Sequence, residues 1–204
     1  MPRPARRDAT RLAILGTGEA AHWHILAMRA VRPISRIAIW GRSPDKAVAL
    51  AARHAGAHAV ATIDEACRDA DIISTVTAAA TPILRAAQLP WGVHLNAVGA
   101  SAPSLQEIAP DCHGACRTVV DYRPSAEAQA GELIAARAAG LLPNDKELPE
   151  IGEILLGYAP GRANAEERTL YRSLGVIAQD LAAANFLLRR AEELGRGTVF
   201  DLYE

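Results

Sequence analysis

Short apolar runs alternate with alanine-rich stretches between residues 11 and 122, and this alternation constrains the fold more than any other feature. Each run is apolar at consecutive positions, which is typical of a strand buried on both faces of a parallel sheet. Strands that alternate with helices predict an α/β fold with a doubly wound parallel sheet. The expected strands cover residues 11–16, 36–40, 57–61, 71–77, 93–99 and 117–122, and the expected helices lie near residues 19–31, 44–55, 64–69, 81–88 and 104–109.

Two of the expected helices carry start signals. Ser43 and Pro44 supply an N-cap followed by a proline at the first helical position. Thr62 and Glu65 have the spacing of a capping box, in which each side chain bonds to the other residue's backbone N–H. These signals concern structure alone.

The chain becomes helical in character after Tyr122. Near its end, apolar residues recur at intervals of three and four, as in an amphipathic helix. They are Leu170, Leu174, Ile177, Leu181, Ala184, Leu188 and Ala191. Such a face packs on its own domain or against a partner helix, and we favour the first. We therefore expect a flexible basic arm over residues 1–10, a sheet domain over 11–142 and a C-terminal helical extension over 143–204 that packs on it.

The segment LAILGTGEAAHWH, residues 12–24, joins the first expected strand to the first expected helix. A glycine turn at such a junction makes a pocket of free backbone N–H groups that suits a pyrophosphate. An ordinary strand-to-helix turn is the alternative, but the position within a strand-helix-strand unit favours a Rossmann-like dinucleotide site. The candidate residues of this turn are Gly16, Thr17, Gly18, Ala20 and Ala21.

The end of the second expected strand bears on the choice of cofactor. An acidic residue there holds the ribose 2'-hydroxyl of NAD, whereas an arginine accommodates the 2'-phosphate of NADP. This chain has Arg42 and Ser43 and no carboxylate before Asp45. The guanidinium fork and the hydroxyl suit a phosphate, so the sequence predicts NADP(H) in preference to NAD(H). The alternative is that Arg42 faces solvent and Ser43 only caps a helix.

Polar residues end two further strands. Thr75 and Thr77 end the fourth expected strand, and Asn96 lies at the end of the fifth. Ligands of open parallel sheets bind beyond the C-terminal ends of the strands. We therefore expect these side chains beside the nicotinamide ribose, although threonine also suits strands and asparagine suits turns.

Composition excludes several classes of function. A formal net charge of -1 and a pI near 6.6 provide no basic field for nucleic acid. No apolar run approaches the roughly 18–20 residues of a membrane span, and the first residues lack a signal peptide's apolar stretch, so we expect a cytoplasmic protein without a membrane partner. Cys112, His113 and Cys116 match no zinc or haem spacing, so no metal is expected.

Several motifs together resemble the ornithine cyclodeaminase/mu-crystallin family. They are G-T-G-E-A-A followed by His24, I-A-I-W-G-R-S-P-D-K-A, A-D-I-I-S-T-V-T, G-V-H-L-N-A-V-G-A and L-Y-R-S-L-G-V-I-A-Q-D-L-A-A-A. Members bind NAD(H) or NADP(H) and act on amino acids and their imines. The resemblance implies an oxidoreductase of small amino or imino acids, such as an imine reductase, that forms a homo-oligomer, a dimer. It implies a nicotinamide site of Gly16, Gly18, Arg42, Thr75, Thr77, Asn96 and Val98, with Ser173 and Gly175 near the nicotinamide end.

The chain departs from the family pattern at two positions. Family members often carry glutamine where this chain has Ala20, which removes one polar group near the cofactor. Cyclodeaminases carry an aspartate after N-A-V-G-x, and Ser101 takes that place here. A serine hydroxyl is no base near pH 7 without help, so Ser101 is the catalytic candidate for a reductase and disfavours cyclising deamination.

The family also has an N-terminal half that carries the groups for the substrate carboxylate, and this chain starts about where that half ends. We therefore expect the cofactor domain alone. Three hypotheses stay open at this point: an NADP(H)-dependent oxidoreductase, a dinucleotide-binding module without catalysis of its own, and a domain that folds only by assembling with other chains. His22, His24 and His94 are the titratable groups nearest the expected site, and a structural role is the more common one for such histidines.

Overall fold

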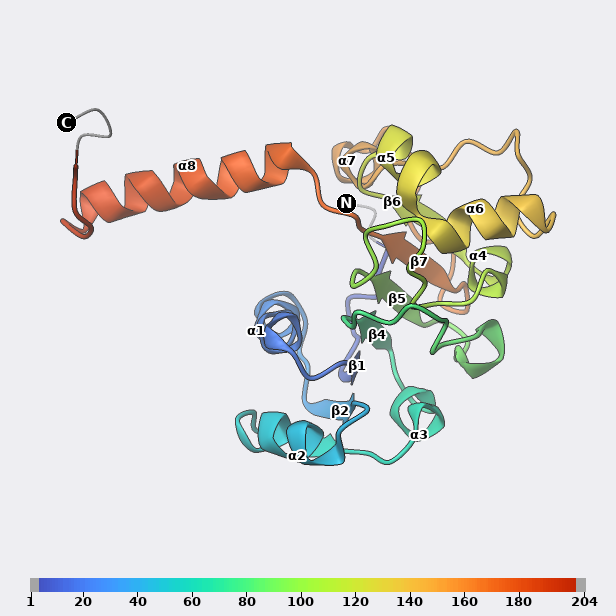
Figure 1. The fold of residues 1–204 in the computed structure, drawn as a ribbon, viewed down its shortest axis with the longest axis horizontal. Coiled ribbons are helices and arrows are strands. Elements are labelled where there is room, and N and C mark those ends of the chain that lie inside the picture. Colours follow the sequence, from blue (N-terminus) through green and yellow to red (C-terminus); the bar gives the residue numbers. More distant parts are fainter. Residues whose placement is uncertain (1–3, 201–204) are drawn as a thin grey trace. The chain divides into compact units, whose positions relative to one another are not determined.

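The computed structural model describes residues 4–200, and the chain divides into two compact units between Leu174 and Gly175. The first unit contains a seven-stranded parallel sheet in the order β3-β2-β1-β4-β5-β7-β6 (Figure 1). The strands are β1 (Arg11–Leu15), β2 (Arg36–Trp40), β3 (Ala57–Ala59), β4 (Ile72–Thr75), β5 (His94–Ala97), β6 (Arg117–Val120) and β7 (Thr169–Arg172). The helices are α1 (Glu19–Val31), α2 (Pro44–Ala52), α3 (Ile63–Cys67), the 3-10 turn η1 (Ala86–Gln88), α4 (Asp111–Ala115), α5 (Arg123–Gln129), α6 (Gly131–Ala138), α7 (Ile151–Leu156) and α8 (Ile177–Glu193).

The strands bury both faces, as their continuous apolar character predicts. In β1, Leu12 and Ile14 enter one core cluster while Ala13 and Leu15 enter another. The six strands expected from the sequence are all present, so the predicted doubly wound α/β fold of Rossmann-like type is confirmed.

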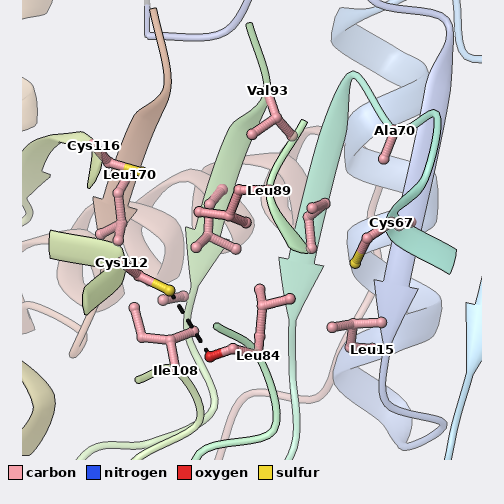
Figure 2. Close-up of a cluster of buried hydrophobic side chains, with 14 of the residues drawn as sticks. Leu15, Cys67, Ala70, Leu84, Leu89, Val93, Ile108, Cys112, Cys116 and Leu170 are labelled. Atoms are coloured by element: carbon pink, nitrogen blue, oxygen red, sulfur yellow. Dashed lines mark hydrogen bonds between the residues drawn. The ribbon is translucent and has the colours of Figure 1, made fainter. Parts of the chain in front are cut away.

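Helices cover the two faces of the sheet (Figure 1). Ile25 of α1 and Leu50 of α2 belong to the cluster on one face. The cluster on the other face includes Cys67 of α3 and Cys112 of α4. Figure 2 shows this second cluster, in which the Cys112 thiol lies 3.8 Å from the carbonyl oxygen of Leu84.

The strand order reverses between β1 and β4, and this reversal positions the functional site. From β1 the chain proceeds outward to β2 and β3 and then returns to β4 on the other side of β1. The connections after β1 and after β4 therefore leave in opposite directions and open a crevice at the C-terminal ends of the strands.

One strand lies where the sequence predicts helix. The helical spacing was expected from Leu170, but Thr169–Arg172 forms β7, which pairs with both β5 and β6. The helix of the second unit, α8, begins at Ile177. Residues 169–172 form backbone hydrogen bonds with a strand on each side, and these tertiary hydrogen bonds override the local helical pattern.

Two expected helices are largely absent. Residues 81–88 contain only the 3-10 turn η1, and residues 104–109 contain no helix. Instead, the two segments pair with each other through a parallel bridge between Leu84 and Ile108. Hydrogen bonds between these segments, from Ile83 N–H to the Glu107 carbonyl and from Ala109 N–H to the Leu84 carbonyl, replace the helical ones.

The N-terminal residues differ from the expected flexible arm. Asp71, at the start of β4, accepts hydrogen bonds from the backbone N–H groups of Thr10 and Arg11, both at 3.0 Å. Its carboxylate also pairs with Arg6 at 2.6 Å, and Ala9 is fully buried. Residues 4–10 are therefore held at the N-terminal ends of the central strands β1 and β4 by a buried carboxylate; residues 1–3 lie outside the described residues.

The second unit is built around α8, whose 17 residues include the expected apolar face of Ile177, Leu181 and Leu188. The expectation that this face packs on the sheet domain stays a prediction. Within residues 4–200, none of the helices combines the length and the apolar character that a bilayer span requires.

Candidate cofactor site

A cavity of about 800 Å³ opens at the C-terminal ends of β1, β2, β4 and β5. This is the crevice at which open parallel sheets bind ligands. Its lining residues are Gly16, Thr17, Gly18, Glu19, Ala20, Trp40, Gly41, Arg42, Ser43, Lys46, Val76, Thr77, Ala78, Ala79, Ala80, Thr81, Ile83, Val98 and Gly99. The cavity thus joins the glycine turn, the end of β2 and the ends of β4 and β5, which are the three regions that the sequence predicts to meet.

Of the two glycines in the turn, the backbone requires one and does not require the other. Gly16 has φ +136, and a Cβ there would lie 2.6 Å from the carbonyl oxygen of Val76, so the turn itself requires glycine. Gly18 has φ -82, and a Cβ there would meet nothing within 4 Å. The fold therefore does not require glycine at position 18, and a side chain there would occupy only the cavity.

The N-terminus of α1 faces this cavity without a side-chain cap. Gly18 is the N-cap of α1 and has no side chain to accept a hydrogen bond from the first turn. A helix N-terminus with free N–H groups attracts anions. The lining includes one carboxylate at this place, Glu19, whose Oε1 accepts a hydrogen bond from Trp23 Nε1 at 2.8 Å.

The far end of the cavity is cationic. Arg42 and Lys46 line it together with Ser43, and no carboxylate of β2 or α2 does so. Ser43 is the N-cap residue of α2, but its side chain makes no capping hydrogen bond. The hydroxyl is therefore not used in capping, in contrast to that of Thr62, which forms the predicted capping box with Glu65.

At the opposite end, the segments that follow β4 and β5 approach each other closely. Thr77, Val98 and Gly99 line the cavity here. A Cβ at Gly99 would collide with the backbone of Thr77, so only glycine permits this approach. The two segments share one carboxylate, that of Glu107, which is 2% exposed.

Three of the predicted site residues are buried and do not line the cavity. Ala21 is fully buried in the core under α1. The Thr75 hydroxyl is buried and donates to Glu107 Oε2 at 2.9 Å. Asn96 is 6% exposed, and its side chain lies between His94 and Ser74 in a buried hydrogen-bonded chain. None of the three lines the cavity, whereas their neighbours Ala20, Thr77 and Val98 do.

The predicted residues near the C-terminal part have separate surroundings. Ser101 is exposed and does not line the cavity. The Ser173 hydroxyl donates to Asp121 Oδ2 at 3.3 Å, at the ends of β7 and β6. Gly175 has φ +92 and belongs to the second unit. A role for these three residues stays a prediction.

The histidines singled out in the sequence are not placed as general acids or bases. Burial lowers the pKa of His94 to about 3, so this side chain is neutral at physiological pH. His22 Nδ1 lies 3.0 Å from His54 Nε2, between α1 and the end of α2. Burial also lowers the pKa of His24. None of the three lines the cavity.

The cysteines show no reactive or metal-binding arrangement. Cys67, Cys112 and Cys116 are free and buried, and burial raises the pKa of Cys67 and of Cys116 to about 12. Among residues 4–200, no cluster of three or more His, Cys, Asp or Glu side chains could hold a metal ion.

Among the residues that sequence reasoning missed are Lys46, a cation of the cavity lining, and Glu107, a buried carboxylate that bonds to the lining residues Thr77 and Gly99. Lys46 lies in the first turn of α2, four residues after Arg42, and a second cation so close to the end of β2 could have identified it. Glu107 lies eight residues after Gly99 in a stretch expected to be helical, and no local signal distinguishes it from a surface glutamate. Only the pairing of residues 83–84 with 107–109 brings it under the cavity.

Comparison with known proteins assigns the chain to a family. The model of the ornithine cyclodeaminase/mu-crystallin family matches residues 4–195. The chain belongs to this family. A Delta(1)-pyrroline-2-carboxylate reductase from Bacillus cereus is 35% identical over 199 residues, which are 95% of this chain and 61% of the relative.

Solved structures of the family share the fold. The Delta(1)-pyrroline-2-carboxylate reductase of Thermococcus litoralis, in complex with NADH and L-proline, superposes with a TM-score of 0.92 at 26% identity; 96% of this chain and 62% of that chain are covered. An archaeal alanine dehydrogenase dimer with bound NAD superposes with a TM-score of 0.88 at 26% identity, over 98% of this chain and 62% of that one. This chain therefore spans about three fifths of the length of these relatives.

Proposed function

We propose that this chain holds a nicotinamide dinucleotide, NADP(H) in preference to NAD(H), and takes part in the reduction of small imino acids. The observation that carries the proposal is Gly18, a glycine that the fold does not need and whose missing side chain leaves the cavity open. Glycine at this point lets a pyrophosphate approach the backbone and the N-terminus of α1.

The cationic end of the cavity supports the preference for NADP(H). Arg42 and Lys46 supply positive charge and Ser43 a hydroxyl that does not cap α2, while the acidic residue that would hold an unmodified ribose is absent from the lining of this end. A charge-assisted hydrogen bond contributes about 1.5–3 kcal/mol, equivalent to roughly tenfold or more in affinity. The solved relatives contain NADH and NAD, so this preference rests on the residues of this chain.

The substrate class rests on family membership. The relatives are named for pyrroline-2-carboxylate reduction and alanine dehydrogenation, both of which involve small amino or imino acids. The bound nicotinamide would supply the hydride in such a reaction. The residues of this chain would hold it in place: Gly18 at the pyrophosphate, and Thr77 and Val98 beside the nicotinamide ribose.

We also propose that the chain self-associates and acts in the cytoplasm. The archaeal relative is a dimer, which supports self-association. The apolar face of α8 offers a surface that can pack on the sheet domain or against the helix of a second copy. Light scattering on the purified chain measures the molar mass directly, and a monomer at micromolar concentration would contradict the proposal.

A titration tests the proposed cofactor. We expect nicotinamide fluorescence to report tighter binding of NADPH than of NADH, and Arg42→Ala to remove most of the difference. The conservative variant Arg42→Lys keeps the charge but loses the bidentate fork, so it should retain part of the preference. Equal affinities of the unmodified chain for the two cofactors would refute the NADP(H) preference.

A turnover assay tests the proposed reaction class. The consumption of NADPH with pyrroline-2-carboxylate, piperideine-2-carboxylate, or pyruvate with ammonia measures imine reduction. Binding of cofactor without consumption of any of these substrates would show that this chain supplies only the cofactor site.

A further inference from the structure

We propose that Glu107 is a positioning residue for the nicotinamide end of the cavity, and that Arg172 fixes the same loop from its other side. This inference rests on the proposed function, because it assigns residues to one end of the proposed cofactor site. The loop concerned is residues 98–101, which follows β5 and contains Val98 and Gly99 of the cavity lining.

Glu107 ties together the segments that follow β4 and β5. Its Oε2 accepts the Gly99 N–H at 2.6 Å and the Thr75 hydroxyl at 2.9 Å. Its Oε1 accepts the backbone N–H of Thr77. One carboxylate therefore sets the separation of Thr77 and Gly99, which both line the cavity.

Arg172 holds the carbonyl side of the same loop. Its guanidinium donates to the carbonyl oxygens of Ala97, at 3.2 Å, and of Ala100. Its side chain is 1% exposed and is paired with Glu132, which is equally buried. A buried carboxylate thus accepts a hydrogen bond from the Gly99 N–H, and a buried guanidinium donates to the carbonyl oxygens on either side of it, those of Ala97 and Ala100.

The position of these charges favours a functional role over a purely structural one. A buried charge is costly, and apolar residues of similar volume often stabilise a fold as well or better. Glu107 and Arg172 come from different parts of the chain, yet both bond to residues 97–100, at the ligand end of β5. Strong hydrogen bonds to fixed charges hold a backbone in one geometry, which is the requirement of a preorganised site.

Glu107→Gln tests this arrangement with almost no change in volume. Both carboxylate oxygens accept a backbone N–H, from Thr77 at one and Gly99 at the other. A glutamine has one oxygen and one NH₂ group, so in either orientation its NH₂ faces one of these N–H groups. One of the two segments must then move away from its position in the cavity wall.

The experiment compares two ligands that share the adenosine end. Adenosine 2',5'-bisphosphate tests the end at Arg42, and NADPH tests both ends. We expect Glu107→Gln to weaken NADPH by about tenfold or more, as the loss of a buried hydrogen-bond partner predicts, and to leave the bisphosphate within twofold.

Asp71→Asn is the matched control. Asp71 is a buried carboxylate that also accepts two backbone N–H groups, but it lies at the other end of β4. The substitution should lower the melting temperature and leave the affinities for both ligands unchanged. A merely structural role of Glu107 would give Glu107→Gln this same result, and that outcome would overturn the inference.

The remaining outcomes separate this inference from the proposed function. If the unmodified chain binds neither ligand, the proposed function fails. If Glu107→Gln does not fold, Thr75→Val decides, because it removes only the hydroxyl donor to Glu107. We expect Thr75→Val to weaken NADPH about three- to tenfold and to spare the bisphosphate; equal effects on the two ligands, or none, would contradict the inference.

Discussion

Substitution of Gly18 separates ligand binding from folding, because its two effects can be estimated from the structure. Gly18 has an extended backbone, with φ -82 and ψ -174, that any residue adopts, and a Cβ there meets no atom within 4 Å. Replacing glycine at such a position stabilises the folded state by about 0.4–1 kcal/mol, because it lowers the conformational entropy of the unfolded chain. Valine is a poor N-cap, which costs a similar amount of about 0.5–1 kcal/mol. The net change in the free energy of unfolding for Gly18→Val should be close to zero.

The effect on binding should be large. The valine side chain would occupy the space through which a pyrophosphate reaches the backbone N–H groups of α1. We expect NADPH to bind at least about a hundredfold more weakly, a loss of about 2.8 kcal/mol. Urea unfolding measures the stability, and a fluorescence titration with NADPH measures the affinity of the same sample.

Gly16→Ala provides the contrast. Gly16 has φ +136, and its Cβ would lie 2.6 Å from the Val76 carbonyl oxygen. This substitution should cost about 1–3 kcal/mol of stability from backbone strain alone. Unchanged NADPH affinity of a folded Gly18→Val protein would refute the reasoning, because it would place the pyrophosphate away from the glycine turn.

Three further predictions concern stability and chemistry. Thr62→Ala should remove the capping box of α3, lower the free energy of unfolding by about 1 kcal/mol and leave NADPH affinity unchanged, as urea unfolding and titration would show. Burial lowers the pKa of His94 and of His113 to about 3, so below pH 6.5 the unfolded chain binds protons that the folded chain does not. Stability should therefore fall as pH drops from 6.5 toward 3, by about 1.4 kcal/mol per pH unit for each histidine, and His113→Gln should reduce the slope of stability against pH; a slope near zero would contradict the burial of both rings. Ornithine should not be converted to proline, because Ser101 is not a base near pH 7 without help, and proline formation from ornithine with NAD would overturn this expectation.

Local sequence patterns predicted the sheet and the entrance of the site. The apolar runs gave six of the seven strands, because a strand buried on both faces needs apolar residues at consecutive positions. The glycine turn and Arg42-Ser43 could be read for a similar reason: a tight turn and a phosphate each require specific residue types at a fixed distance from a strand end. Except for the buried Ala21, all of the residues predicted in these two motifs line the cavity.

Only the tertiary structure revealed which polar residues face the cavity and which support it. Thr75 and Asn96 have the residue types expected of a site, but the pleat of β4 and β5 directs both into buried hydrogen bonds. Alternation along a strand sends neighbouring side chains to opposite faces, and the sequence alone does not say which face the ligand uses.

The sequence by itself determined the strand-helix alternation, the glycine turn and the family, since these depend on residues that are close in the chain or on motifs in fixed order. Tertiary structure alone decided that residues 169–172 form β7, and that Glu107 and Arg172 meet the loop after β5 from its two sides. The physical reason is that a central strand and a buried charge are both stabilised by partners far away in the sequence, which no local pattern encodes. The backbone carbonyls that Arg172 bonds lie more than 70 residues before it, and Glu107 reaches its partners only because residues 83–84 pair with residues 107–109.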